Sequence, residues 1–274
     1  MNYLPYDMPF LRRASHLMWK VGFRRMAALI LTLIFSLIAA PARSQTAHAR
    51  SVIAKETSTV PLVIVIGFVG GFINRNNPSH AEVQLAARLR KDYSSGVDIE
   101  TFENRSGEEA RKQILALLDT DHDGDLTARE KKNARIILYG HSWGGAQAVV
   151  LARKLEKDGV PVLLTIQVDS VAGKRQNDAL IPANVVQAAN FFQPDGRLHG
   201  QPEIRAADPA RTKIIGNFRF DYKSSAYNCK GYPWYDRIFG KSHTQIECDP
   251  VVWERVESLI RADLPPAVAS GPEH

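Results

Sequence analysis

Between residues 61 and 264, short apolar segments alternate with longer segments whose apolar residues recur at helical spacing. The first apolar segment, PLVIVIG at 61–67, has the unbroken hydrophobicity of a strand that is buried on both faces. The other strand-like segments are 97–102, 134–139, 160–168, 185–192 and 212–218, and the helical ones are 79–93, 106–118, 144–157 and a last helix that begins at Asp249-Pro250. Strands that alternate with helices form a mostly parallel sheet with helices on both faces. The sequence therefore predicts an α/β domain over 61–264, with a linker at 50–60 and a flexible proline-rich tail at 265–274.

The first 49 residues have the pattern of an export signal rather than of a folded domain. Residues 27–40 form an apolar run of 14 residues without a charge, and Arg24 and Arg25 precede it. A membrane-spanning helix needs roughly 20 apolar residues, whereas the apolar core of a signal peptide is shorter. Small residues that suit cleavage follow at 40–42 and 47–49. We therefore expect a signal peptide and a periplasmic or secreted protein, with an uncleaved N-terminal membrane anchor as the alternative.

The basic composition of the chain comes from this same segment. The formal net charge is +6, and residues 1–49 hold six basic residues against a single acidic residue, Asp7. Five of the six net positive charges therefore lie in the segment that cleavage would remove. A protein that binds nucleic acid usually presents a basic surface, and the rest of the chain carries a net charge of only +1. Nucleic acid is thus not an expected partner, and a membrane is one only through an uncleaved N-terminal segment.

Cys229 and Cys248 are the two cysteines of the chain. In an oxidising compartment, two cysteines most simply form one disulfide. We expect this bond in the exported protein, where it would stabilise the fold by about 3 kcal/mol. Two buried free thiols are the alternative.

One pentapeptide joins a predicted strand directly to a predicted helix. Gly140-His141-Ser142-Trp143-Gly144 follows the strand ARIILY and precedes the helical segment GAQAVVLARKL. The G-x-S-x-G pattern in this setting is typical of a nucleophile elbow, in which glycines permit a tight turn and the serine is held at the carboxyl edge of the sheet. The N-terminus of the next helix stabilises negative charge that develops there. Ser142 is therefore predicted to be a catalytic nucleophile, and an inert serine in a glycine-rich turn is the alternative.

With this motif, residues 61–264 resemble the α/β-hydrolase superfamily, and GHSWGG is the most specific piece of the resemblance. The resemblance implies a compact, lipase- or esterase-like serine hydrolase in which an acid and then a histidine follow the nucleophile along the chain. The residues before 61 are too few to supply the first two strands of the full family pattern. The connection at 170–184 is too short for a cap domain, so we expect a fairly open site.

The histidine that the resemblance implies is His243, which lies between the last predicted strand and the terminal helix. It would take the proton of Ser142 and return it to the leaving group. Two residues compete for the role of the acid. Asp169 directly follows the apolar strand at 160–168, whereas Asp195 lies in a Pro-Asp-Gly turn, where aspartate is common for conformational reasons alone. We favour Asp169 as the residue that orients His243 and keep Asp195 as the alternative.

An oxyanion hole needs two backbone N–H groups. The resemblance assigns one to Trp143, the residue after the nucleophile, and the other to the loop that follows PLVIVIG. Ile66-Gly67 takes the place of the His-Gly pair of the family, which makes Phe68 the second donor, with Val69 as the alternative.

Residues 119–130, DTDHDGDLTARE, fit the twelve-residue calcium loop of an EF-hand. Carboxylates occupy the ligand positions, a glycine stands at the sixth position for the sharp turn, and a glutamate at the twelfth can bind a cation through both oxygens. The predicted ligands are Asp119, Asp121, Asp123, Asp125 and Glu130. Because the loop leads into the strand that ends before Ser142, the ion would lie at the opposite edge of the sheet and would be structural rather than catalytic. A solvated acidic turn is the alternative.

Together these features predict an exported serine hydrolase that cleaves carboxylic esters or lipids through Ser142, His243 and Asp169. The enzyme would use structural calcium and no organic cofactor. Thioesters and amides are further substrates that the same chemistry allows. A protein of this fold that binds a partner or calcium without catalysis is the alternative function.

Overall fold

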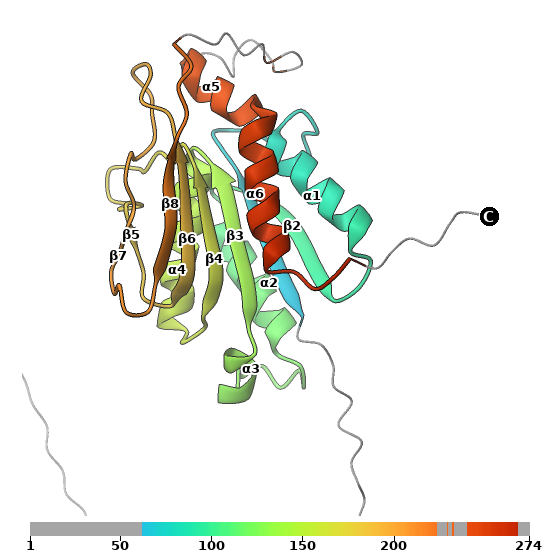
Figure 1. The fold of residues 1–274 in the computed structure, drawn as a ribbon. Helices are drawn as coiled ribbons and strands as arrows, with labels where there is room; N and C mark the ends of the chain where they lie inside the picture. Colours follow the sequence, from blue (N-terminus) through green and yellow to red (C-terminus); the bar gives the residue numbers. More distant parts are fainter. Residues whose placement is uncertain (1–61, 224–228, 230–231, 233–239, 268–274) are drawn as a thin grey trace, which may run out of the picture. The chain divides into compact units, whose positions relative to one another are not determined.

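The computed structural model describes residues 62–223, 229, 232 and 240–267. Six parallel strands form its main sheet in the order β2-β1-β3-β4-β6-β8 (Figure 1). Their bounds are Val63–Val69 for β1, Val97–Glu103 for β2, Arg135–His141 for β3, Val162–Val168 for β4, Val185–Phe192 for β6 and Lys213–Arg219 for β8. A separate parallel pair is formed by β5 (Leu180–Ile181) and β7 (Arg205–Ala206). The six predicted strands are thus confirmed, and the short pair is an addition that two-residue strands are too brief to reveal in a sequence.

Helices cover both faces of this sheet. They are α1 (Ala81–Asp92), α2 (Gly107–Leu118), α3 (Ala128–Lys132), α4 (Trp143–Lys157), α5 (Lys241–Cys248) and α6 (Pro250–Ala262). One face is covered by α1 and α6 and the other by α2 and α4 (Figure 1). Along β1, Val63 and Val65 pack into the first core, whereas Ile64 and Ile66 pack into the second. Because both faces of the strand are buried, its sequence is apolar without alternation, and the predicted α/β architecture is confirmed.

Three neighbouring strands end at the same edge of the sheet. His141 at the end of β3 is in register with Val168 at the end of β4, which is in register with Phe191 of β6. Since the strands are parallel, the residues that follow β3, β4 and β6 meet at this carboxyl edge. Figure 1 shows α5 at this edge and α3, which leads into β3, at the opposite one.

The segment that carries His243 forms a helix that is not among the predicted elements. His243 lies in the first turn of α5 rather than in a loop. The helix has only eight residues, and Ile246 is its one large apolar side chain in the core. That pattern is too short to predict a helix from spacing alone.

The connection between β4 and β6 contains only β5, so it holds no cap domain. The predicted signal segment at 1–49, the predicted linker at 50–60 and residues 268–274 of the predicted tail lie outside the described residues. Within the part of the chain that the structure describes, no helix is both long and apolar enough to span a bilayer.

Candidate active site

Ser142 occupies a sharp turn between β3 and α4. Its backbone φ is 55° and its ψ is −126°, a conformation that is rare for a residue other than glycine. A Cβ atom on Gly140 would lie 2.6 Å from the backbone carbon of Gly144, and one on Gly144 would collide with the carbonyl group of Phe68. Only glycine fits at these two positions. The sequence GHSWG therefore forms a strand–turn–helix elbow that holds the serine at the carboxyl edge.

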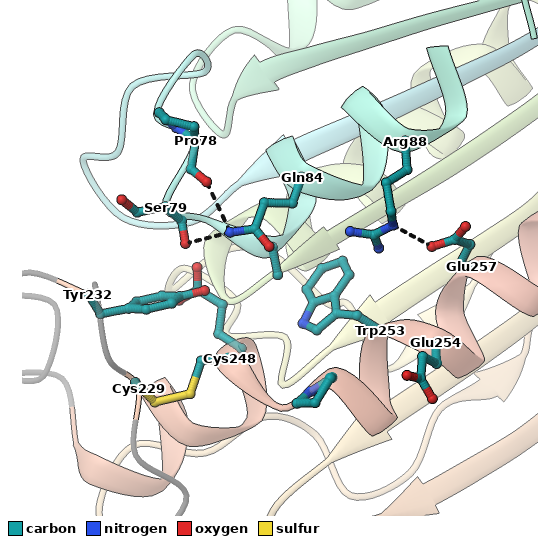
Figure 2. Close-up of a pocket in the computed structure, with 13 residues that line it drawn as sticks. Pro78, Ser79, Gln84, Arg88, Cys229, Tyr232, Cys248, Trp253, Glu254 and Glu257 are labelled. Atoms are coloured by element: carbon teal, nitrogen blue, oxygen red, sulfur yellow. Dashed lines mark hydrogen bonds and ion pairs between the residues drawn. A yellow bond between two sulfur atoms is a disulfide. The ribbon is translucent and has the colours of Figure 1, made fainter. Parts of the chain in front are cut away.

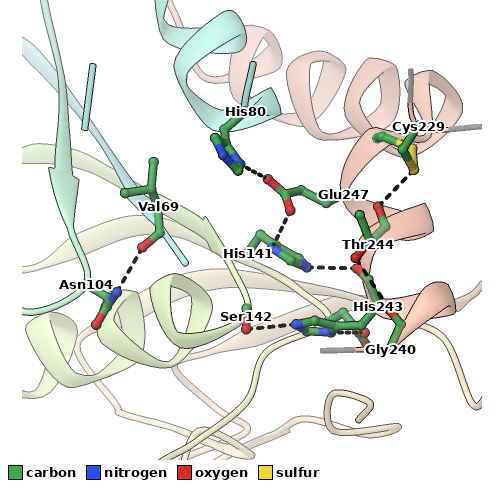
Figure 3. Close-up of polar contacts among 12 residues, drawn as sticks. Val69, His80, Asn104, His141, Ser142, Cys229, Gly240, His243, Thr244 and Glu247 are labelled. Carbon is green, nitrogen blue, oxygen red and sulfur yellow. Dashed lines mark hydrogen bonds and ion pairs between the residues drawn. A yellow bond between two sulfur atoms is a disulfide. The ribbon is translucent and has the colours of Figure 1, made fainter. Parts of the chain in front are cut away.

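Ser142, His243 and Asp169 form a hydrogen-bonded chain. The Nε2 atom of His243 lies 2.8 Å from the Ser142 Oγ (Figure 3), and its Nδ1 lies 2.6 Å from the Asp169 Oδ2. All three residues are buried. Because an ionised carboxylate can only accept a hydrogen bond, the ring proton sits on Nδ1, and Nε2 is left to accept the hydrogen of the serine hydroxyl. The geometry suits proton transfer from the serine to the imidazole.

Three further hydrogen bonds hold the Asp169 carboxylate, one of them from the backbone N–H of Gln193 to Oδ1 at 3.4 Å. The Nε2 of Gln193 donates to Oδ2 at 2.8 Å, and the backbone N–H of Gly200 donates to Oδ1 at 2.6 Å. The residue is fully buried. Both oxygens therefore have partners, which fixes the plane of the carboxylate opposite His243.

Asp195, the competing acid, has different partners. Its Oδ2 accepts the backbone N–H of Tyr222 at 2.8 Å, and its Oδ1 lies 3.4 Å from the Nζ of Lys223. The Tyr222 N–H and the Lys223 ammonium hold the pKa of Asp195 below its usual value. Of the two acids that the sequence leaves open, the structure brings Asp169 to His243.

The structure corrects the position of the predicted oxyanion loop. Phe68 and Val69 do not lie in a loop, because β1 pairs with β2 as far as Val69. Phe68 is fully buried within the strand. The first residues beyond the strand are Gly70 and Gly71, and a Cβ atom on Gly70 would lie 3.0 Å from the Cβ of Ser142. The backbone that faces the nucleophile therefore starts at Gly70.

Asn104, the residue that follows β2, forms hydrogen bonds to the carbonyl groups of this turn. Its Nδ2 donates to the carbonyl oxygen of Val69 at 3.4 Å (Figure 3) and also to that of Gly71. In a trans peptide the N–H points opposite to the C=O, so the N–H groups of the same two peptide units point away from Asn104. Since β2 and β3 lie on opposite sides of β1, these N–H groups point toward the side of Ser142.

A cavity of about 520 Å³ opens over Ser142 and His243. Leu198 lines it, as do Phe72 and Trp143, whose side chains meet edge to face with their ring centroids 5.5 Å apart. Phe72 is 78% exposed and Trp143 is 36% exposed, so the rim of the cavity is aromatic and open to solvent. Trp143 is also the first residue of α4, where backbone N–H groups have no partner within the helix.

Beside His243 lies a second group of histidines and carboxylates, which no pattern in the sequence indicates. The His141 ring packs against that of His243 with their centroids 4.6 Å apart, and its Nε2 lies 3.2 Å from the His243 carbonyl oxygen. The His141 Nδ1 lies 3.4 Å from the Glu247 Oε2, and the Glu247 Oε1 lies 2.5 Å from the His80 Nδ1 (Figure 3). With Glu82, these residues form what we call the buried His–Glu cluster: His80, Glu82, His141 and Glu247.

Burial is the largest single influence on the pKa of each ionisable group in this cluster for which a shift is seen. It raises the pKa of Glu82 to about 8, with a further contribution from the charge of Glu247. It also lowers the pKa of His141 to about 4. Burial acts to raise the pKa of Glu247, but the neighbouring histidines outweigh it and the pKa is lowered. The members come from the start of α1 and the ends of β3 and α5, so only the fold brings them together.

The predicted disulfide between Cys229 and Cys248 is present, with the Cα atoms 5.6 Å apart. Cys248 ends α5, so the bond ties residue 229 to the helix that carries His243. A second cavity, of about 620 Å³, lies beside the disulfide (Figure 2). Glu247 lines both this cavity and the one over Ser142.

The acidic loop brings three of its five predicted ligands together. Carboxylate oxygens of Asp119, Asp121 and Asp123 lie within 4.8 Å of one another. Gly124 has a φ of 89°, and its backbone N–H donates to the Asp119 Oδ2 at 3.0 Å. The sharp turn predicted at the sixth position of the loop is therefore formed.

The other two predicted ligands, Asp125 and Glu130, do not join this group. Both oxygens of Glu130 instead accept hydrogen bonds from Thr120 and Thr127, at 2.7 to 2.9 Å. These bonds, first among them that of the Thr120 hydroxyl, lower the pKa of Glu130 to about 2. Glu130 is thus engaged in capping α3, since it forms a capping box with Thr127.

No protein-family model and no curated protein matches this chain. Among solved structures, an uncharacterized protein from Pseudomonas aeruginosa matches with a TM-score of 0.42 and 10% identity over 74% of this chain and 46% of that one. This chain therefore spans less than half of that protein. A cutinase-like protein from Cryptococcus sp. matches with a TM-score of 0.39 and 13% identity over 77% and 98% of the two chains. A dienelactone hydrolase-like promiscuous phosphotriesterase from metagenomic libraries matches with a TM-score of 0.36 and 16% identity over 76% and 89%. Similarity at this level assigns no function.

Proposed function

We propose that this protein is a serine hydrolase of the α/β-hydrolase superfamily that cleaves carboxylic esters. The observation that carries the proposal is the chain from the Ser142 Oγ through His243 to Asp169 at a strand–turn–helix elbow. An inert serine in a glycine-rich turn would need neither an imidazole at 2.8 Å nor a buried carboxylate behind that imidazole.

The reaction would run in two halves, with His243 moving a proton in each. In the first, Nε2 takes the proton of Ser142 as Oγ attacks the ester carbonyl carbon, and Asp169 stabilises the imidazolium that forms. The imidazolium then gives its proton to the alcohol oxygen as the carbon–oxygen bond breaks, which leaves an acyl group on the serine. In the second half, water replaces the serine as the nucleophile, and the acid and the free enzyme are released.

The oxyanion that forms in each half needs two N–H donors. We assign one to Trp143 at the start of α4 and the other to the turn after β1, where Gly70 or Phe72 supplies the backbone N–H in place of Phe68. Two features support this assignment. The turn lines the cavity beside Ser142, and Asn104 binds its carbonyl groups on the far side. One such donor contributes about 10²- to 10³-fold in kcat.

The cavity supports an ester with an apolar acyl or aryl group as substrate. Its volume of about 520 Å³ is in the range of small-molecule sites. Phe72, Trp143 and Leu198 provide apolar surface near the nucleophile. Lipid esters and thioesters share this chemistry, and the acyl-chain preference will distinguish among them.

We further propose a structural Ca²⁺ ion in the acidic loop, held by Asp119, Asp121 and Asp123. Three carboxylates within 4.8 Å repel one another, and the cation would supply the neutralising charge. The Asp119 Oδ1 is buried and lacks a hydrogen-bond partner among the described residues, as expected of a ligand atom. The loop leads into the start of β3, whereas Ser142 follows the end of the same strand. The ion would therefore lie at the opposite edge of the sheet and would stabilise the fold without touching the substrate.

Export is also part of the proposal. The Cys229–Cys248 disulfide supports an oxidising compartment, and the charge and apolar pattern of residues 1–49 supports a signal segment.

The test is hydrolysis of p-nitrophenyl esters with acyl chains of increasing length. Ser142→Ala is expected to lower kcat by at least about 10³-fold, because the nucleophile is lost. Ser94→Ala, a change at an exposed serine, serves as the matched control and should leave kcat unchanged. If no ester shows turnover that depends on Ser142, the non-catalytic alternative is favoured.

A further inference from the structure

We propose that the buried His–Glu cluster binds a divalent transition-metal ion of the zinc class, with His80, Glu82 and Glu247 as ligands. One ligand atom from each of the three residues lies within 4.8 Å of the others. An imidazole nitrogen together with carboxylate oxygens is a donor set that Zn²⁺ takes, whereas Ca²⁺ and Mg²⁺ prefer oxygen alone. This site is separate from the acidic loop and independent of the proposed hydrolysis.

Glu82 is the residue that most needs a cation. It is fully buried, and among the described residues no hydrogen bond of normal geometry reaches either carboxylate oxygen, although the backbone N–H groups of Glu82 and His141 lie near the carboxylate. Protonation does not solve this problem, because a neutral carboxylic acid still needs an acceptor for its O–H and a donor for its carbonyl oxygen. A metal ion bound to the carboxylate would satisfy it directly.

The charge balance of the cluster also favours a bound cation. Two carboxylates, Glu82 and Glu247, lie together in the interior. In the described part of the chain, the ion pairs of Glu247 go to His80 and His141, and no lysine or arginine pairs with either glutamate. Two buried carboxylates side by side cannot both be ionised without a cation, and one divalent ion would let both carry their charge.

The orientation of His141 adds a fourth candidate donor. Its Nε2 faces the carbonyl oxygen of His243, which can only accept, so in the neutral ring the proton sits on Nε2. Its Nδ1 then presents a lone pair to the Glu247 Oε2 at 3.4 Å. Two acceptor atoms that face each other gain from a cation beside them. An ion bound here would also hold the His141 ring against that of His243.

The ion would reach the cluster from either cavity. His80 and Glu247 line the cavity over Ser142, and Glu247 also lines the cavity beside the disulfide (Figure 2). Binding would replace the hydrogen bond between the His80 Nδ1 and the Glu247 Oε1 with bonds to the metal. Because metal ligands must be deprotonated, binding would release protons.

The experiment measures zinc on the intact, purified protein. The protein is stripped with 1,10-phenanthroline, reloaded with ZnCl₂ in the presence of CaCl₂, and measured for metal content by mass spectrometry and for affinity by titration calorimetry. We expect one zinc ion per chain and a higher Tm in the loaded protein. Glu82→Gln and Glu247→Gln should each weaken zinc binding by at least about 10- to 100-fold, whereas the loop variant Asp121→Asn should bind zinc as the wild type does.

Two results would overturn the proposal: no zinc on the wild-type protein at micromolar ZnCl₂, or zinc binding that Asp121→Asn removes and Glu82→Gln retains. If the glutamate variants fail to fold, Co²⁺ substitution in the wild type decides. A visible d–d spectrum of the kind given by mixed nitrogen and oxygen ligands supports the site, and its absence refutes it. None of these readouts depends on esterase activity.

Discussion

Two groups of buried histidines and carboxylates lie side by side at the carboxyl edge of this sheet, and they differ in how their carboxylates are satisfied. Both oxygens of Asp169 have donors, and the chain through His243 ends at the hydroxyl of Ser142. In the other group, no hydrogen bond of normal geometry reaches either oxygen of Glu82 among the described residues, and no nucleophile follows the imidazole of His141.

The difference shows why residue type alone does not define a site. A carboxylate whose hydrogen bonds are complete orients an imidazole and stabilises its charge, which suits proton transfer. A buried carboxylate whose hydrogen bonds are incomplete is stabilised by a cation. The same two residue types therefore support catalysis in one group and ion binding in the other.

The largest expected effect distinguishes the role of Asp169 from that of Glu247. Asp169→Asn should lower kcat on a p-nitrophenyl ester by about 10⁴-fold, because the imidazole takes the wrong tautomer. Glu247→Gln should lower kcat by less than about tenfold at saturating substrate, because Glu247 contacts His141 and His80 rather than His243. Circular dichroism checks that both variants fold. Equal losses of kcat would mean that the two groups act as one catalytic unit.

Loss of the disulfide should affect stability more than chemistry. Cys248 ends the helix that carries both Glu247 and His243. With 19 residues of separation between the cysteines, the paired change Cys229→Ser and Cys248→Ser should lower the free energy of unfolding by about 3 kcal/mol in urea titrations. At 25 °C the folded variant should keep its kcat, since the contacts of His243 with Ser142 and Asp169 do not involve sulfur. An unchanged urea midpoint would contradict this expectation.

Calcium removal should lower the Tm without affecting either histidine group. At calcium concentrations about 100 times Kd, the ion contributes about 2.7 kcal/mol, and EGTA should therefore lower the Tm by about 5 to 10 °C. The kcat at 25 °C should not change, because the acidic loop lies at the opposite edge from Ser142. Asp121→Asn should abolish the response of Tm to calcium. A loss of activity with no change in Tm would place the ion in catalysis instead.

The smallest expected effect concerns the turn in front of Ser142. Asn104→Ala should lower kcat by about 10- to 100-fold with little change in KM, because a misplaced N–H weakens binding of the oxyanion alone. Asn76→Ala, at an exposed asparagine near the same turn, is the control. A rise in KM without a change in kcat would show that Asn104 shapes the cavity rather than the oxyanion site.

The parts of the site that the sequence predicted are those in which one local pattern fixes the geometry. The strand ARIILY, the two flanking glycines and the following helix place Ser142, and the strand before Asp169 brings that residue to the same edge. Phe68 was misplaced because pairing with β2 extends β1 to Val69, and strand ends depend on neighbouring strands rather than on local sequence.

The remaining parts depend on contacts between distant segments. Glu130 occupies the twelfth position of the acidic loop, yet Thr120 and Thr127 occupy both of its oxygens. Asn104 follows β2 and has no pattern of its own, so only the order of the strands shows that it lies behind the oxyanion turn. In the same way, Glu82 and Glu247 meet only because α1 and α5 converge at one edge.

The most direct test of the central claim is covalent labelling by a p-nitrophenyl alkylphosphonate, followed by intact-mass measurement and peptide mapping. We expect a single adduct on Ser142 with release of one p-nitrophenolate per chain, absent in Ser142→Ala and slowed by at least about 10³-fold in His243→Ala. If Ser142 stays unmodified under conditions that label trypsin completely, or if Ser142→Ala is labelled as fast as the wild type, this serine is not an activated nucleophile and the protein is not a serine hydrolase.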